Sequence, residues 1–301
     1  EIFDSKFTKN VEFNQVLKSV QGVENSDYEH FVDTLFKPDT DKQEELKKLF
    51  DSIKKTTAKE DLLYHIKMEM LMQVAEREGC TYIFFGDSAT RQAIKMISWT
   101  AKGRGYSLPL DISVDTEIRG MGIMRPMKDM LSKEIGLYNH FSALQVLPPY
   151  NYSTMMPPKS SIDRLTEGFI NSLERDFPST VSTVCRTTLK LTPAKDMDMS
   201  RQCAVCMMPY QTGITEWRKH ITVAQVPEKA EKETCCKENC CKDTKVDMNQ
   251  HVCYSCQVDF KDYSPETIER LPGFVHQKVI EQGRQDRLLN EIKDFLINDD
   301  E

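Results

Sequence analysis

Two Cys-x-x-Cys pairs, Cys203/Cys206 and Cys253/Cys256, constrain this chain more than any other feature of its sequence. The two-residue gap lets both thiolates of a pair turn toward one metal ion, and two pairs complete the closed tetrahedron of structural zinc. Four free thiols or a redox disulfide are the alternative, but two such pairs arise by chance much less often than one. The pattern therefore predicts one zinc site that holds structure, since a closed site leaves no position for a reacting water.

The other cysteines carry weaker signals. Ten cysteines in a chain that shows no secretory signal indicate a reducing compartment, so we expect a cytoplasmic protein rather than a disulfide scaffold. Four of them lie in a charged insertion, where they bind a second soft metal, exchange with sulfur donors or, as we favour, are dispensable thiols in a disordered loop. These four are Cys235, Cys236, Cys240 and Cys241. We expect Cys80 and Cys185 to be buried, and His251 to be a substitute metal ligand or a neighbour of the ligands.

Composition excludes some classes of protein. The formal net charge of −7 argues against indiscriminate nucleic-acid binding. Residues 81–220 are nevertheless mildly basic between acidic flanks, so a polyanion is expected to meet the middle of the chain. No apolar run reaches the length of a membrane span, and we expect no membrane partner. Because the chain starts at Glu1 rather than Met, we expect it to be a trimmed or partial form of a longer protein.

Residues 57–99 follow the order helix, strand, tight turn, helix. Thr57-Ala58-Lys59-Glu60 has the form of a capping box, and the apolar residues after it recur at helical spacing until Gly79. A strand over Thr81–Phe85 and a helix over Ala89–Trp99 flank the turn Gly86-Asp87-Ser88. This order is typical of α/β proteins with a parallel sheet, which is the fold class that we predict.

Weaker signals complete the expected organisation. We expect a strand near Leu108–Val114. Helices are expected at Tyr28–Phe36, Gln43–Ile53, Asp129–Phe141, Ser160–Phe177, Ser179–Leu191, directly after Ser264-Pro265-Glu266, and at Asp286–Ile297. The chain then divides into an α/β domain (1–147), a linker with helices (148–200), a zinc-ribbon-like four-cysteine module (201–260) with a disordered insertion (227–250), and a C-terminal helical segment with an acidic tail (261–301).

Basic residues gather in the loops that follow the expected strands. They are Lys102, Arg104, Arg119, Arg125 and Lys128. Such loops meet at the carboxyl edge of a parallel sheet, where phosphate contacts and a solvated basic surface are equally good interpretations. The turn Gly86-Asp87-Ser88 either holds a phosphate at a helix N-terminus or, as we favour, is an ordinary capped turn. The sequence shows no nucleotide-phosphate loop, no nucleophile–histidine arrangement and no pair of catalytic carboxylates.

Taken together, these segments resemble the cytoplasmic tRNA 2-thiolation protein 2 family. The resemblance covers most of residues 55–260 and rests on the order and spacing of motifs that are individually loose. The motifs are Asp61–Gly79, Tyr82–Gly86, Asp87–Arg91, Lys102–Gly105, Arg125–Asp129 with Glu134, Val184–Thr187, the two Cys-x-x-Cys pairs around a variable insertion, and the acidic C-terminus.

The resemblance implies a concrete role. The family acts in a complex that replaces the 2-oxygen of the wobble uridine with sulfur in the tRNAs for Lys, Glu and Gln, with the sulfur supplied by a ubiquitin-related carrier. Its members are the partners of a catalytic subunit and share, in degenerate form, that subunit's Rossmann-like ATP-pyrophosphatase (PP-loop) fold. For this chain the resemblance implies a heterodimer that binds tRNA. The residues expected at the tRNA are Arg91, Lys102, Arg104, Arg119, Arg125 and Lys128.

Two departures favour a subunit without chemistry of its own. Catalytic relatives carry paired acids where this chain has Gly86–Arg91, and cluster-binding cysteines in the α/β domain where this chain has only Cys80. The family's N-terminal part has no match here, as expected of a partial chain whose sheet lacks its first strands. We therefore expect structural zinc and no bound ATP. The alternatives are an ATP-dependent tRNA thiolase in its own right and a zinc-dependent scaffold that recruits the sulfur carrier.

Overall fold

The structure is a computed structural model, and it describes residues 40–113, 115–145, 157–195, 197–211, 213–221 and 248–292. The expected helix Tyr28–Phe36, the acidic tail and the cysteines of the insertion lie outside the described residues. The insertion is shorter at its C-terminal side than we expected, because residues 248–250 already belong to an ordered 3-10 turn.

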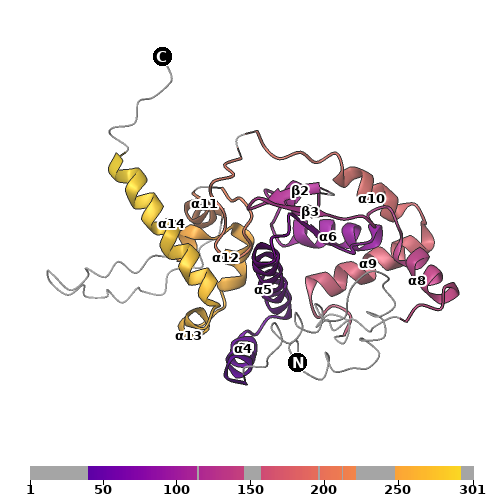
Figure 1. The fold of residues 1–301 in the computed structure, drawn as a ribbon, viewed down its shortest axis with the longest axis horizontal. Helices are drawn as coiled ribbons and strands as arrows, with labels where there is room; N and C mark the ends of the chain where they lie inside the picture. Colours follow the sequence, from indigo (N-terminus) through magenta and orange to yellow (C-terminus); the bar gives the residue numbers. More distant parts are fainter. Residues whose placement is uncertain are drawn as a thin grey trace, which may run out of the picture.

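The described residues form a mostly helical α/β fold with a small mixed sheet (Figure 1). The helices are α4 (Thr40–Ser52), α5 (Thr56–Arg77), α6 (Ala89–Ala101), α7 (Leu108–Asp111), α8 (Ser132–Phe141), α9 (Ile162–Asp176), α10 (Thr180–Thr188), α11 (Ile214–Ile221), the 3-10 helix η1 (Met248–His251), α12 (Tyr254–Phe260), α13 (Pro265–Glu269) and α14 (Gly273–Ile292). The strands are β1 (Tyr82–Phe84), β2 (Asp115–Ile118) and β3 (Met121–Met124).

Helix α5 lies at the centre of the molecule, between the sheet and the helices of the C-terminal part (Figure 1). Its apolar residues, among them Leu62 and Met72, are buried, which explains why this stretch gave the strongest helical signal. The predicted capping box is wrong: the helix begins at Thr56, so Thr57 lies inside the first turn. The Thr57 hydroxyl instead accepts a hydrogen bond from the backbone N–H of Ile162, 3.2 Å away.

The sheet has the order β1-β3-β2, with β1 parallel and β2 antiparallel to β3. The expected strand at Leu108–Val114 is wrong, because Leu108–Asp111 forms the short helix α7, with a proline in its first turn. The chain then makes a β2–β3 hairpin through Arg119 and Gly120, whose φ values of 55° and 78° are those of a type I′ turn. The sheet is therefore mixed within the described residues, whereas we expected a parallel one.

Helices α6, α9 and α10 pack together on one side of α5 (Figure 1). Ala93 and Ile94 of α6 share a core with Ile170 of α9 and Val181 of α10. Ser161 caps α9 by accepting a hydrogen bond from the Arg164 backbone N–H at 3.1 Å. The linker and its helices thus form part of the fold's second hydrophobic cluster.

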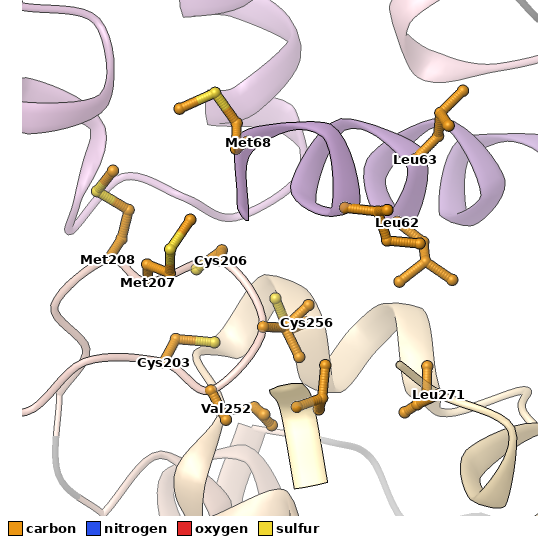
Figure 2. Packing of buried hydrophobic residues seen from close by; sticks show 14 of the residues in the cluster. Leu62, Leu63, Met68, Cys203, Cys206, Met207, Met208, Val252, Cys256 and Leu271 are labelled. Atoms are coloured by element: carbon orange, nitrogen blue, oxygen red, sulfur yellow. The ribbon is translucent and has the colours of Figure 1, made fainter. Parts of the chain in front are cut away.

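The main hydrophobic core runs from α4 and α5 through the four cysteines to α14. Figure 2 shows the part of this core around α5 and the cysteines. Helix α14 begins at Gly273, much earlier than the expected Asp286, because Val275 and Val279 pack into this core. In Figure 2, Met68 of α5 lies on the side of the loop that carries Cys203 and Cys206, and Leu62 lies on the side of the helix that carries Cys256. The division of the chain at residues 147, 200 and 260 stays a prediction.

Candidate metal centre and its charged surroundings

The four cysteines of the two pairs lie together, and we call Cys203, Cys206, Cys253 and Cys256 the four-cysteine cluster. Their sulfur atoms all lie within 4.8 Å of one another, and the Sγ atoms of Cys206 and Cys253 are 3.7 Å apart. Tetrahedral zinc with sulfur ligands at about 2.3 Å spaces those ligands by roughly 3.8 Å. All four thiols are free, so the disulfide alternative is not what the structure shows. The spacing fits one metal ion held by four thiolates.

The first pair lies on a tight turn. The backbone N–H of Cys203 donates to Met208 O and that of Met207 to Cys203 O, both at 2.9 Å, while Gln202 and Pro209 close the turn as a β-bridge. Met207 has a φ of 64°, in the left-handed region that glycine adopts without strain. This turn directs both thiols of the pair to the same side.

The second pair begins α12. Cys253 is the N-cap residue of that helix, and its backbone N–H donates to the sulfur of Cys203 over 3.3 Å. A further hydrogen bond, from Ala204 N–H to His251 O at 3.0 Å, joins the two halves of the site. The imidazole of His251 lies 3.8 Å from Asp286 and is not grouped with the four thiols, so it is not a substitute ligand.

The surroundings of the cluster favour one thiolate, at Cys253, because hydrogen bonds among the thiols raise the pKa values of Cys206 and Cys256. Hydrogen bonds from the other three thiols, followed by the charge of Arg104, hold the pKa of Cys253 well below its usual range. Arg104 itself is 3% exposed, and its guanidinium donates to His65 Nε2 at 2.5 Å. Although burial opposes its charge, Asp61 and the cluster thiolates raise the pKa of Arg104 well above its ordinary value. A buried cation therefore partly balances the negative charge that four thiolates bring.

Lys102 is also an interior residue. Its side chain is 3% exposed, and its ammonium group pairs with Asp61 of α5 at 2.6 Å and with Asp163 of α9. Those carboxylates outweigh burial and raise the pKa of Lys102. The lysine therefore joins two helices that are far apart in the sequence.

Arg125 and Arg119 are likewise engaged with the protein. Arg125 is 3% exposed and donates to the backbone carbonyls of Asp111, at 2.9 Å, and Ser113. Arg119 contacts Glu69 at 3.1 Å and keeps 28% of its side chain exposed. Of the six basic residues expected at tRNA, only Arg91, Lys128 and Arg119 present partly exposed side chains, while Lys102, Arg104 and Arg125 are buried.

The turn Gly86-Asp87-Ser88 is an ordinary capped turn. Ser88 Oγ accepts from the Arg91 backbone N–H at 3.3 Å, and the Ala89 N–H donates to Met130 O at 2.9 Å. The Asp87 carboxylate is occupied by Lys95 at 2.6 Å. The start of α6 is thus satisfied by the protein itself, as we favoured from the sequence.

The cysteines outside the cluster differ from expectation. Cys80 is exposed rather than buried, because it directly follows the end of α5 at Gly79. Cys185 is half-buried, and its thiol donates to Ala89 O at 3.4 Å. Within the described part of the chain, no helix is both long and apolar enough to cross a bilayer.

Comparison with known proteins supports the resemblance. The family model of cytoplasmic tRNA 2-thiolation protein 2 matches residues 161–258, which include the four-cysteine cluster. The chain is 33% identical to cytoplasmic tRNA 2-thiolation protein 2 of Bos taurus, over 88% of this chain and 56% of that protein. The human protein of the same name is 32% identical, over 85% of this chain and 55% of its own length.

Among solved structures, the U34-tRNA thiolase NcsA of Methanococcus maripaludis, described with its iron–sulfur cluster, matches with a TM-score of 0.37 and 12% identity. That match covers 55% of this chain and 53% of the other. The chain spans about half the length of the curated relatives that it matches. It belongs, over most of its own length, to the cytoplasmic tRNA 2-thiolation protein 2 family.

Proposed function

We propose that this chain acts in cytoplasmic tRNA 2-thiolation as a non-catalytic subunit. Its family membership supports the pathway. The observation that carries the division of labour is the start of α6, where Met130 and Ser88 already accept from the backbone N–H groups of Ala89 and Arg91, two of the donors that a nucleotide phosphate would need. On this proposal a catalytic partner supplies the ATP site, and the complex works on the wobble uridine of the tRNAs for Lys, Glu and Gln.

We propose zinc as the metal of the four-cysteine cluster. Four thiolates without an open position are the ligand set of structural zinc, and the metal would tie the turn at 203–208 to α12. The residues of this chain contribute the thiolates, the hydrogen bond to Cys203 and the nearby charge of Arg104. The role of the site is to hold the fold.

The contact with the catalytic subunit is proposed for the exposed apolar residues of β1 and α8. Tyr82 and Phe84 of β1 are 58% and 68% exposed, and Phe141 of α8 is 81% exposed. Helix α8 buries none of its residues. Aromatic residues are enriched at protein interfaces.

The proposed phosphate contacts are the partly exposed basic residues Arg91, Lys128 and Arg119. Charge reversal of Arg104 or Arg125 tests the stability of the protein before it tests RNA binding, because both side chains are buried. Arg91→Glu with Lys128→Glu is the sharper experiment. It is expected to weaken tRNA binding and to lower its salt dependence, whereas Arg175→Glu, at a 77% exposed side chain on α9, serves as the matched control.

The experiment that tests the pathway measures 2-thiouridine in bulk tRNA by mass spectrometry after depletion of this protein in cells. Loss of the modification, restored by the wild-type protein, supports the proposal; an unchanged level contradicts it. Nucleotide-dependent thiolation by this chain alone would instead favour the independent enzyme. Capture of the sulfur carrier by the Arg91→Glu/Lys128→Glu variant, together with no RNA binding by the wild type, would favour the scaffold.

A further inference from the structure

A cavity of about 520 Å³ lies where the loop after α6 meets the four-cysteine module. Its lining includes Tyr106, Arg104, Trp217, Tyr254 and the cluster residue Cys253. The volume is in the range of small-molecule sites, enough for one nucleoside. Of these residues only Arg104 and Cys253 were considered from the sequence, because the others come from segments that only the fold brings together.

One side of the cavity is aromatic, and its tyrosine ring fits there because the residue beneath it is a glycine. Tyr254 packs directly on Gly103, where an added Cβ would meet the tyrosine ring at 2.5 Å. Trp217 contacts the same ring edge-to-face, with centroids 5.7 Å apart and an angle of 72° between the planes. Trp217 is nevertheless 54% exposed. A fixed tryptophan with an uncovered surface is the kind of side chain on which nucleic-acid bases stack.

The polar side of the cavity is a single buried cation. Arg104 is 3% exposed, its guanidinium donates to His65 Nε2 at 2.5 Å, and its Nε atom is itself buried. The cavity lining contains no other lysine or arginine. A neutral ring suits this lining better than a carboxylate or a phosphate, which would need accessible positive charge.

We propose that this cavity takes one unstacked base from a single-stranded loop of tRNA, stacked on Trp217. Single-stranded loops are where proteins reach the edges and faces of RNA bases. The inference rests on the proposed function, since it assumes that the chain meets tRNA. It adds a place for a base, whereas Arg91 and Lys128 contact the phosphates.

The two tryptophans allow a direct test, because Trp99 is 4% exposed and Trp217 is not. In a Trp99→Phe form of the full, metal-bound chain, Trp217 is the sole tryptophan reporter. A short single-stranded RNA and an unmodified tRNA transcript are both expected to quench its fluorescence. Trp217→Ala, made in the otherwise wild-type chain, is expected to weaken RNA binding by about 5- to 100-fold, the range measured for loss of one stacking contact.

Two control variants separate stacking from a general loss of structure. Trp217→Phe keeps a stacking ring and is expected to retain most of the affinity. Phe169→Ala removes a 53% exposed aromatic residue of α9, far from the cavity lining, and is expected to leave affinity unchanged. Equal weakening by Trp217→Phe and Trp217→Ala would overturn the stacking role.

The outcomes also distinguish this inference from the proposed function. If tRNA binds but neither quenches Trp217 nor responds to Trp217→Ala, the cavity is not a base site and the proposed function stands. If the chain binds no RNA while cellular 2-thiouridine still depends on it, the cavity inference again fails and the pathway is retained. Quenching by a peptide with a free C-terminal carboxylate, and not by RNA, would overturn the base and assign the cavity to a protein tail.

Discussion

The four-cysteine module buries its apolar side chains, whereas β1 and α8 leave large apolar side chains exposed to solvent. Every residue from Cys203 to Met208 is at most 5% exposed, although this stretch is a turn. On β1, by contrast, Tyr82 and Phe84 are more than half exposed, although a strand in an α/β sheet is normally covered on both faces. Regular secondary structure therefore does not mark where the interior of this molecule lies.

The two regions differ in how far the rest of the chain surrounds them. In the module, four sulfur atoms from two distant segments lie within 4.8 Å of one another, and the cysteines are part of the main hydrophobic core. The sheet is less surrounded, since within the described residues β1 pairs on one side only. We therefore expect substitutions in the module to affect folding, and substitutions on the exposed strand and helix to affect the proposed partner binding.

The largest expected effect is at the module. Cys256→Ser removes a buried ligand, and loss of a structural zinc site costs on the order of 10 kcal/mol of folding free energy. We expect the variant to lose its metal and to unfold around residues 203–260, as measured by metal content and thermal denaturation. Cys80→Ser, at an exposed thiol, is the control and retains both properties. Full metal content and native melting of Cys256→Ser would remove the basis of the comparison.

The next effect is at the ion pairs that join α5 to α9. Lys102→Ala leaves the 5% exposed Asp61 without its ammonium partner, which is expected to cost about 3–5 kcal/mol. Urea denaturation measures this loss, with Lys128→Ala as a half-exposed control. A loss below 1 kcal/mol, on the scale of surface ion pairs, would show that Lys102 is solvated in solution and available for RNA.

A smaller effect concerns pH. Burial, followed by the charge of Asp61, raises the pKa of Asp259 to about 8. Since the folded state holds this proton more tightly than the unfolded state, the free energy of unfolding falls as the pH rises from about 4 through 8. Asp259→Asn cannot ionise, so it is expected to gain on the order of 1 kcal/mol at pH 8 after solvent screening. Denaturation at pH 6 and pH 8 checks the prediction, and an equal slope in both proteins would contradict it.

The smallest effect on stability, and the sharpest contrast, is at the exposed surface. Phe84→Ser and Phe141→Ser are each expected to change the free energy of unfolding by less than about 0.5 kcal/mol, because their rings already lie in solvent. The same variants are expected to reduce copurification with the catalytic subunit. A destabilisation of several kcal/mol would mean that this surface is covered within the chain, and the proposed division between folding and partner binding would fail.

The sequence was informative where local pattern and structure agree. Helices α5, α6, α9 and α10, strand β1 and the pairing of the cysteines follow from periodicity, caps and spacing. The four-residue helix α7 was predicted as a strand, because Leu108 and Leu110 alternate as strand residues do and the length is too short for helical periodicity. Short segments of this kind are decided by their tertiary surroundings.

The basic residues show a different reason for error. The sequence of a loop with Lys102 and Arg104 suggests a surface for polyanions, because the partners of these residues are distant in the sequence. Asp61 is 41 residues from Lys102, and His65 is 39 residues from Arg104. No local pattern pairs such residues. Trp217 and Tyr254 were missed for the same reason, because only the fold brings them to one cavity.

The carboxylate of Glu69 has a consequence for how the protein is made. It is buried on α5 and binds Arg119 in the hairpin turn. It also accepts a hydrogen bond from the ammonium group of Lys278 of α14 at 2.8 Å, although Lys278 is 209 residues further along the chain. During synthesis α5 leaves the ribosome together with Arg119 but long before Lys278, so the burial of this carboxylate is completed last. We therefore expect the main core to close only after residue 278 has been translated, because Val275 and Val279 of the same helix belong to it.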